Sequence, residues 1–266
     1  MVDSTSLAQG EHVFRTADGF DLQYFVRGSG PLVIVLPPAW GIGSFYLQDG
    51  FAELQNKFTL VYLEFRSNAK STRREAELMT VWHLVDDVES LRQELNLEQI
   101  PHLMGHSGGG TVALWYAIRH PDKVTNHLLP NHRLEGFDDS ESSGAALAEK
   151  KQDPRLHSAL EAGPNTWDGL SDTEFAKTLV QFLPVYFYDP SVASTSTLAS
   201  TSTLASLTTA PLWNYQMPHG KDRPSRHQED QLDKVQARTL MIFSRDDPIT
   251  TPIHGMATKK GITNSD

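Results

Sequence analysis

The residues of this chain that could do chemistry centre on one serine. Ser107 lies in the segment Gly105–Gly109, whose sequence GHSGG has the form G-x-S-x-G. An apolar run precedes it, and a run rich in alanine and aromatic residues follows at 111–118, so we predict a strand, a sharp turn and a helix. Because small residues let the strand and helix approach, such a turn pushes its serine outward as a nucleophile. Alternatively, the turn only joins strand to helix and the serine is idle.

A serine nucleophile needs a base, a carboxylate that orients the base, and donors for an oxyanion. The carboxylate candidate is Asp247, in the segment Ser244–Ile249 directly after the strand-like run 239–243. Open parallel sheets place their catalysts in the loops beyond the carboxyl ends of the strands. We therefore choose Asp247 over Asp246. The alternative is a turn aspartate beside proline, which is a frequent turn composition.

Two backbone N–H groups are the expected oxyanion donors. One belongs to Gly108, the residue after the serine, and the other to the loop Pro37–Gly41 that follows an apolar strand. Proline has no N–H, so Ala39 is the first available donor of that loop. Trp40 is the next donor and is also expected to form a wall of the substrate pocket. Alternatively, the loop is only a rigid proline turn.

The elements that must position these residues alternate between strand and helix patterns. Residues 32–36 and 58–63 are continuous apolar runs, typical of strands buried on both faces. Apolar residues recur at helical spacing from Thr80 to Leu95, and a further helix is expected over roughly Phe45–Gln55. Such alternation predicts an α/β fold with a mostly parallel sheet covered by helices on both sides.

This rhythm divides the chain into three parts. Residues 1–132 form the first part of the α/β core, and residues 236–266 continue it with one more strand. The intervening residues 133–235 are polar, helical in patches and rich in loops, so we expect a helical cap inserted between sheet strands; the alternative is a small second domain. A tandem repeat lies inside it, Ser194–Ala199 followed by Ser200–Ala205, and its Ser and Thr content predicts a flexible loop or frayed helix.

Composition excludes several classes of function. The formal net charge of −10 argues against a nucleic-acid-binding surface, which needs a basic stripe. The chain has no cysteine, so it holds no disulfide, thiolate nucleophile or cysteine-ligated metal. No histidine pair has metal-ligand spacing with a carboxylate, and we expect no metal and no cofactor. With no secretory signal or apolar span in the sequence, we expect a cytoplasmic protein whose partner is a small-molecule substrate, with no membrane contact and the oligomeric state left open.

The chain resembles α/β-hydrolases of the branch that includes proline iminopeptidases, epoxide hydrolases and related esterases and lactonases. The matching pieces are Gly105–Gly109, Pro37–Gly41, Glu64–Ser71 and Ser244–Asp247 with Pro252. The resemblance covers nearly the whole chain, although the cap matches only in character. It implies an α/β-hydrolase fold, and a serine at position 107 implies acyl transfer. Many fungal relatives of this family act in secondary metabolism, so such a role is also implied.

The chain departs from the family pattern at several positions. The family's first loop usually begins His-Gly, whereas both positions are proline here. In the family's Asp-x-Arg-Gly-x-Gly-x-Ser segment, Glu64, Ser67 and Ala69 replace the aspartate and both glycines. Ser244 stands where the family has glycine before the acid.

In the family, the three catalytic residues follow the chain order serine, acid and histidine, so the histidine base should come after Asp247. No residue of this sequence is assigned to that role. Residues 252–266 resemble the helix and turn before the last strand, so we expect that strand and the histidine loop to be missing. His254 is the one histidine after Asp247, and we expect it to start a helix behind the sheet. The side chain of His106 is expected to point away from the pocket. His132, His219 and His227 lie in or beside the cap, and nothing selects one of them.

The sequence therefore predicts a serine hydrolase for a small ester, lactone, thioester or amide, with Ser107, Asp247, Gly108 and Ala39 as its site. One alternative is a catalytically impaired or non-enzymatic member that lacks the triad histidine. A second alternative is an aminopeptidase similar to proline iminopeptidase. That activity would need acidic cap residues to hold a substrate ammonium, and the candidates are Glu135, Asp138 and Asp139.

Overall fold

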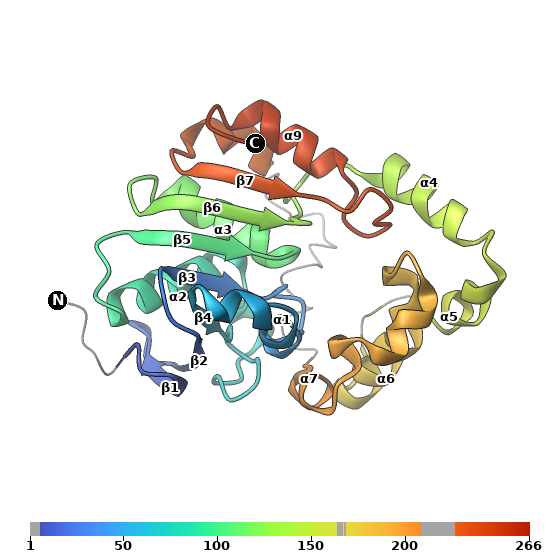
Figure 1. The fold of residues 1–266 in the computed structure, drawn as a ribbon, viewed down its shortest axis with the longest axis horizontal. Helices are drawn as coiled ribbons and strands as arrows, with labels where there is room; N and C mark the ends of the chain where they lie inside the picture. The colour runs from blue at the N-terminus through green and yellow to red at the C-terminus, as the bar shows by residue number, and fades with distance from the viewer. Residues whose placement is uncertain (1–5, 164–166, 168, 209–226) are drawn as a thin grey trace.

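A sheet with strand order β1-β2-β4-β3-β5-β6-β7 runs through the molecule (Figure 1). The computed structural model describes residues 6–163, 167, 169–208 and 227–266, and the statements below concern those residues. The pairs β1–β2 and β2–β4 are antiparallel, and all later neighbours are parallel. The predicted mostly parallel α/β sheet is therefore confirmed.

The described chain alternates between strands and helices along most of its length. The strands are β1 (Gly10–Arg15), β2 (Asp21–Arg27), β3 (Leu32–Leu36), β4 (Thr59–Leu63), β5 (Ile100–Gly105), β6 (Val124–Pro130) and β7 (Arg238–Ile242). The α-helices are α1 (Phe45–Gly50), α2 (Val81–Glu94), α3 (Gly108–Arg119), α4 (Ser140–Lys150), α5 (His157–Ala162), α6 (Asp172–Phe182), α7 (Thr201–Ser206) and α9 (Ile253–Gly261). Short 3₁₀ turns cover Ala52–Asn56, Ala76–Leu78, Pro154–Leu156, Leu183–Tyr186, Pro190–Thr195, Thr197–Ala199 and Gln228–Lys234.

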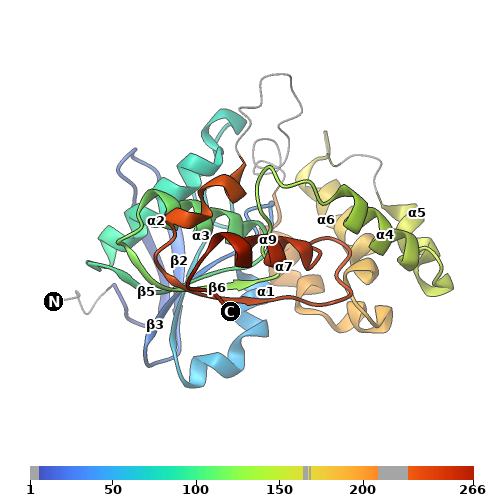
Figure 2. The same ribbon diagram turned by 90° about the horizontal axis from the view of Figure 1, so that it is seen from above.

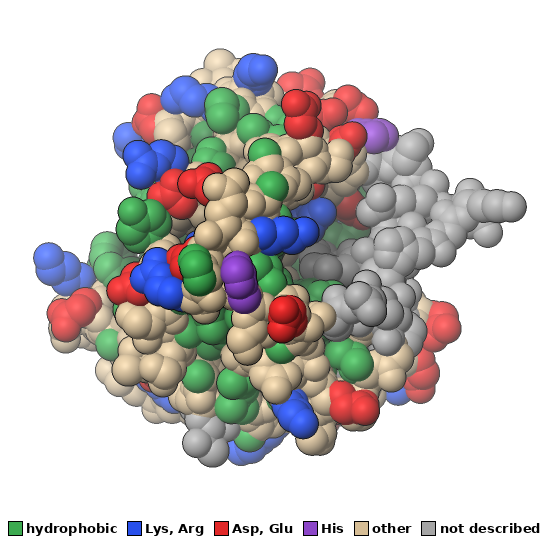
Figure 3. Space-filling model, turned by 90° about the vertical axis from the view of Figure 1, so that its right-hand side faces the viewer, with side chains coloured by type: hydrophobic (Ala, Val, Ile, Leu, Met, Phe, Trp, Pro, Cys, Tyr) green, Lys and Arg blue, Asp and Glu red, His purple; other side chains and the backbone are tan. Residues whose placement is uncertain are grey.

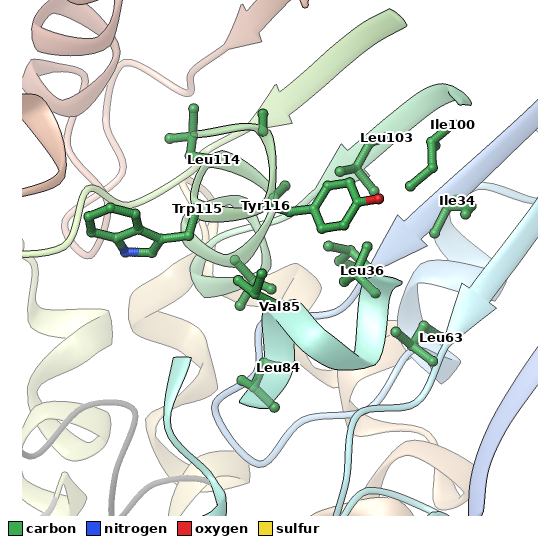
Figure 4. Packing of buried hydrophobic residues seen from close by; sticks show 14 of the residues in the cluster. Ile34, Leu36, Leu63, Leu84, Val85, Ile100, Leu103, Leu114, Trp115 and Tyr116 are labelled. Carbon is green, nitrogen blue, oxygen red and sulfur yellow. The ribbon is translucent and has the colours of Figure 1, made fainter. Parts of the chain in front are cut away.

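The central strands are buried on both faces, as their continuous apolar sequences predict. In β3, Ile34 joins the apolar cluster that contains α2 and α3, while Val35 joins the cluster on the opposite face beside α1. Side chains of β5, α2 and α3 interlock on the first face (Figure 4), where Leu103 and Trp115 are almost fully buried. This packing fixes the strand ends that carry the candidate site.

One predicted helix is shorter than expected. The pattern over residues 45–55 predicts one continuous helix, but α1 ends at Gly50, and a separate 3₁₀ turn begins at Ala52. Phe51, between them, has φ −103° and ψ +17°, which are not helical angles. Glycine has poor helix propensity and commonly stands at helix ends, so Gly50 accounts for the break.

Helices α4 to α7 and the short turns between them, residues 140–206, are here called the helical insertion. They lie beyond the carboxyl ends of β5, β6 and β7 in two perpendicular views (Figures 1 and 2). The insertion has an apolar cluster of its own around Leu156, Ala159 and Val185. The tandem repeat within it forms short 3₁₀ turns and the six-residue helix α7, where the sequence predicts a flexible loop or frayed helix.

The chain continues beyond α9 toward β7. The N–H of Thr239 donates to the carbonyl of Asn264 at 2.9 Å, and that of Met241 to Asp266 at 2.8 Å, in a parallel arrangement. Residues 264–266 thus lie alongside β7. Of the helices described, none combines the length and hydropathy needed to span a bilayer.

The surface seen from the side of the helical insertion carries both signs of charge (Figure 3). Lysine and arginine side chains alternate there with aspartate, glutamate and hydrophobic ones, and neither sign forms a continuous stripe on the described part of this face.

Candidate active site

Ser107 stands on a strained turn between β5 and α3. Its φ of +54° and ψ of −122° are unusual for a residue with a side chain, and such angles cost free energy that the surrounding structure must supply. The N–H of Ser107 donates to the carbonyl of Pro130 at 3.4 Å, and its carbonyl accepts from Arg133 at 3.2 Å. The turn is thus fixed to the end of the neighbouring strand β6.

The glycines around Ser107 are required by the close approach of strand and helix. A Cβ added to Gly105 would lie 2.4 Å from the carbonyl oxygen of Gly109. A Cβ added to Gly109 would lie 2.2 Å from the carbonyl oxygen of Pro37. Neither approach leaves room for a side chain, so the crowding inferred from the sequence is present in the structure.

Asp247 lies on the loop directly after β7, at the same edge of the sheet as Ser107. Its carboxylate accepts from the N–H groups of Ile249 at 2.8 Å and Thr250 at 3.0 Å, and from the Thr250 hydroxyl at 3.0 Å. It also accepts from the side-chain amide of Asn131 at 2.6 Å. Asp246, in contrast, is exposed and pairs with Arg245. The structure therefore places Asp247, and not Asp246, toward the interior.

The loop Pro37–Gly41 lies beside the Ser107 turn. The N–H of His106 donates to the carbonyl of Leu36 at 3.2 Å, which joins the two segments. Ala39 is fully buried with φ +58°, a left-handed conformation that strains a residue with a Cβ. Trp40 packs edge-on against Trp167 of the insertion region, with ring centroids 4.9 Å apart.

A cavity of about 270 Å³ lies between the core and the helical insertion. Its floor includes Ser107 and Gly108, and Trp40 forms part of its wall. Ile249 and Thr250 bring the Asp247 loop to the same cavity. The further lining residues are Pro38, Ile42, Tyr46, His106, Arg133, Trp167, Phe182, Tyr186 and Leu198. The structure therefore brings the serine turn, the proline loop and the acid loop together around one apolar space.

The expectation for His106 is wrong, because its ring lines this cavity instead of pointing away. Its Nδ1 lies 2.6 Å from the hydroxyl of Tyr46, which holds the ring toward α1. Burial lowers the pKa of His106 to about 4, an effect that the charge of Asp247 partly opposes. Burial also raises the pKa of Tyr46 well above its usual value. Both groups are consequently neutral near pH 7.

The other histidines are held elsewhere. His254 lies in α9 behind the sheet, as predicted, where its Nε2 is 3.1 Å from Asp139 and its Nδ1 accepts from the N–H of Leu134. His132 is buried, with its Nε2 2.7 Å from the hydroxyl of Thr258. His227 is exposed, and His219 lies outside the described residues. Among the hydrogen bonds of residues 6–163, 167, 169–208 and 227–266, none joins a histidine ring to Asp247.

The three acidic residues considered for an aminopeptidase do not line the cavity. Glu135 accepts from the indole N–H of Trp115 at 2.6 Å. Asp138 accepts from the N–H of Ser140 at 3.0 Å, and Asp139 is engaged with His254. Within the described part of the chain, no three His, Asp or Glu side chains gather as a metal site would require.

Sequence reasoning missed two residues of this site, Asn131 and Arg133. Both follow β6 directly, and β6 is the parallel neighbour of β5 and β7. The signal that selected Asp247, a polar residue beyond the carboxyl end of a parallel strand, applies to them equally. Tyr46 carried no comparable signal, because its partner His106 is 60 residues away in the chain.

Comparison with known proteins agrees with this geometry. Residues 32–131 match the family described as alpha/beta hydrolase fold. The AB hydrolase superfamily protein YclE of Bacillus subtilis is 28% identical over 177 residues, which cover 65% of this chain and 61% of that protein. A proline iminopeptidase of Clostridioides difficile is 29% identical over 172 residues, which cover 60% of this chain and 54% of that protein. The chain thus matches less than two thirds of the length of either relative.

Solved structures share the fold. An esterase from Rhodococcus superposes with a TM-score of 0.71 at 17% identity, covering 96% of this chain and 88% of the esterase. The strand order and the strand–turn–helix around Ser107 define an α/β-hydrolase fold. The sequence matches and the fold together support the assignment of this chain to the α/β-hydrolase superfamily.

Proposed function

We propose that this protein is a serine hydrolase that acts on a small ester, lactone, thioester or amide. The observation that carries the proposal is the position of Ser107, on a turn with positive φ at the floor of an apolar cavity. The strain of that turn has a cost, and a backbone held in such angles is typical of functional sites. The hydrolases and esterases similar to this chain give further support.

In this proposal, the Ser107 Oγ attacks the carbonyl carbon of the substrate, and the bond from that carbon to the alcohol, thiol or amine leaving group breaks. The leaving group gains the proton that the serine loses, and water then hydrolyses the covalent acyl intermediate. The N–H groups of Gly108 and Ala39 hold the oxygen that gains negative charge. Gly108 suits this role because it begins the twelve-residue helix α3 and lines the cavity, and a helix N-terminus favours negative charge. Losing one such donor typically costs about 10²–10³-fold in rate.

We assign Asp247 to the position of the acid, which in an α/β-hydrolase orients the histidine that takes the serine proton. None of the histidine rings in residues 6–163, 167, 169–208 and 227–266 is hydrogen-bonded to Asp247, so the base stays unassigned. The four hydrogen bonds of Asp247 hold its carboxylate at the end of β7, where the superfamily order of serine, acid and histidine requires it.

A labelling experiment with an uncharged alkyl fluorophosphonate tests the proposal. We expect one phosphonyl group per chain on the peptide that contains Ser107, and none on a folded Ser107→Ala variant. Ser90→Ala is the matched control, because Ser90 lies on α2 and its hydroxyl donates within its own helix to Asp86. Absence of labelling in the folded protein would reject this function and favour the impaired or non-enzymatic alternative.

A further inference from the structure

Arg133 places a positive charge inside the cavity that holds Ser107. It lines that cavity together with Ser107 and Gly108, and its backbone N–H donates to the Ser107 carbonyl at 3.2 Å. Its side chain is 44% exposed. The backbone of Arg133 is thus attached to the nucleophile turn, and its partly exposed side chain belongs to a residue of the cavity lining.

The charge of Arg133 is only loosely balanced. Its Nη2 lies 3.8 Å from Oδ1 of Asp139, beyond hydrogen-bonding distance. The other oxygen of Asp139 is 3.1 Å from Nε2 of His254, a closer contact. Among the described residues that line the cavity, Arg133 is the one Lys, Arg, Asp or Glu. A bound anion would therefore meet a cation with unused N–H groups and no opposing carboxylate on the wall.

The surroundings of Arg133 strengthen this attraction. Trp40, Trp167 and Phe182 form aromatic walls, with Trp167 packed edge-on against both of the others. His106 is neutral near pH 7, because burial lowers its pKa to about 4. Charge pairs are stronger where apolar walls exclude water, and arginine presents two parallel N–H groups to a carboxylate.

We propose that Arg133 binds a carboxylate of the substrate, so that the natural substrate is an acid-bearing ester, lactone, thioester or amide with an apolar body. This inference rests on the proposed function, because it places the carboxylate in the same cavity as the Ser107 Oγ. The aromatic walls take the apolar part, and Arg133 fixes its orientation relative to the serine. The cavity volume of about 270 Å³ limits the substrate to a small molecule.

The same cation disfavours an aminopeptidase role at this site. A substrate ammonium beside Arg133 would be repelled, and Glu135, Asp138 and Asp139 contact other groups of the protein. An aminopeptidase would need a carboxylate where the described wall presents a guanidinium.

A binding experiment tests the proposal separately from catalysis. The Ser107→Ala protein is titrated with monobenzyl succinate, which carries a carboxylate, and with benzyl methyl succinate, its uncharged ester. Fluorescence of Trp40 and Trp167 or titration calorimetry reports binding. We expect the carboxylate to bind about tenfold more tightly or better, with a preference that falls as salt rises.

Three variants in the same background assign that preference. Arg133→Gln should reduce the ratio of the two affinities to about one. Arg133→Lys should retain part of the preference, because the charge stays but the paired N–H geometry is lost. Arg119→Gln is the matched control: it removes the same charge from the end of α3, where Arg119 pairs with Asp86, and should leave the preference unchanged.

Equal affinity for the two ligands in the Ser107→Ala protein, or a preference that survives Arg133→Gln, would overturn the proposal. If Arg133→Gln does not fold, an undiminished preference in Arg133→Lys overturns it, and a reduced one supports it. If the fluorophosphonate labelling fails while the carboxylate preference still depends on Arg133, that result would reject hydrolysis and keep the carboxylate site. The two proposals therefore fail by different measurements.

Discussion

The side-chain amide of Asn131 donates to Oδ2 of Asp247 across 2.6 Å and joins the ends of β6 and β7. Asn131 has φ +43°, and its backbone N–H donates to the carbonyl of Ile242 at 2.8 Å. Its side-chain oxygen also lies 3.4 Å from the N–H of Ser244. One asparagine therefore makes one contact to the end of β7 and two to the loop after it, and these contacts set the direction of the candidate acid.

Replacing Asn131 by glycine tests this positioning role. Glycine tolerates the left-handed backbone, so Asn131→Gly removes the amide without adding strain. Asp247 keeps its bonds to Ile249 and Thr250, so we expect the protein to fold and the rate of Ser107 phosphonylation to fall about tenfold to a hundredfold. Asn126→Ala is the control: Asn126 lies on β6, and its side-chain amide donates to the carbonyl of Pro101 on β5, away from the site. Equal rates in the two variants would show that Asn131 does not position the acid.

The crowding at Gly109 makes a prediction about stability. The Cβ of Gly109→Ala would lie 2.2 Å from the backbone oxygen of Pro37, which cannot move aside as a flexible side chain could. We expect a loss of about 1–3 kcal/mol or more in the free energy of unfolding, measured by urea denaturation. Gly144→Ala is the matched control on α4, where nothing lies within 4 Å of the added methyl. That change should stabilise by about 0.5–1 kcal/mol, and a similar loss in both variants would contradict the argument.

The local sequence pattern predicted the strands that are buried on both faces and the helices that bury one face. The run 32–36 corresponds residue for residue to β3, and the helical spacing after Thr80 corresponds to α2, which begins at Val81. Both elements follow from the spacing of apolar residues. A strand buried on both faces of a sheet, or a helix packed against the sheet, imposes that spacing directly. Asp247 was found because strand position and chain order restrict it to one loop.

The other residues of the candidate site depend on contacts between residues that are far apart in the sequence. The ring of His106 enters the cavity because Tyr46, 60 residues earlier, holds it there. Arg133 reaches the cavity because the Ser107 carbonyl accepts its N–H. No local pattern encodes either contact, since neither periodicity nor turn composition specifies which side chain fills a space between core and insertion.

The buried ion pair of Arg66 and Asp87 predicts a large stability effect. Both side chains are fully buried, and the guanidinium Nε donates to Asp87 at 2.9 Å, joining the segment after β4 to α2. Arg66→Met leaves the Asp87 carboxylate buried without its partner, so we expect a loss of about 3–5 kcal/mol in urea unfolding. The double variant Arg66→Met, Asp87→Leu should recover most of that loss, because it removes both charges.

An exposed pair supplies the control for this prediction. Arg15 and Asp21 form an ion pair at 3.0 Å, but their side chains are 68% and 53% exposed. Solvent screens such pairs, so Arg15→Met should change the free energy of unfolding by only about 0–1 kcal/mol. A loss in Arg66→Met no greater than in Arg15→Met would refute the importance of burial.

The buried carboxyl of Glu64 should give the stability of the protein an unusual dependence on pH. Its carboxyl is fully buried, and burial raises its pKa from 4.5 to about 7, although hydrogen bonds from Ser44 partly oppose the shift. An acid with a raised pKa holds its proton more tightly in the folded protein. Between pH 4.5 and 7 the folded state therefore binds more protons at this site than the unfolded state, and the free energy of unfolding falls as pH rises.

Buried histidines act in the opposite direction over part of that range. Burial lowers the pKa of His106 and His127 to about 4 each, so the unfolded state binds their protons first on acidification. Their contribution to the free energy of unfolding rises with pH between about 4 and 6.5. The pH profile of the unaltered protein thus mixes two signs, and only a difference between variants isolates Glu64.

The comparison with Glu64→Gln supplies that difference. Glutamine keeps an acceptor for the N–H of Ser44, which donates to Glu64 at 2.8 Å, but it does not titrate. Urea unfolding from pH 5 to pH 8 should show the unaltered protein losing about 2.5 kcal/mol relative to Glu64→Gln, with most of the change between pH 5 and 7. Glu98→Gln, which makes the same chemical change at an exposed position after α2, is the matched control. A flat difference for Glu64→Gln would mean that Glu64 titrates near its ordinary pKa in the folded protein.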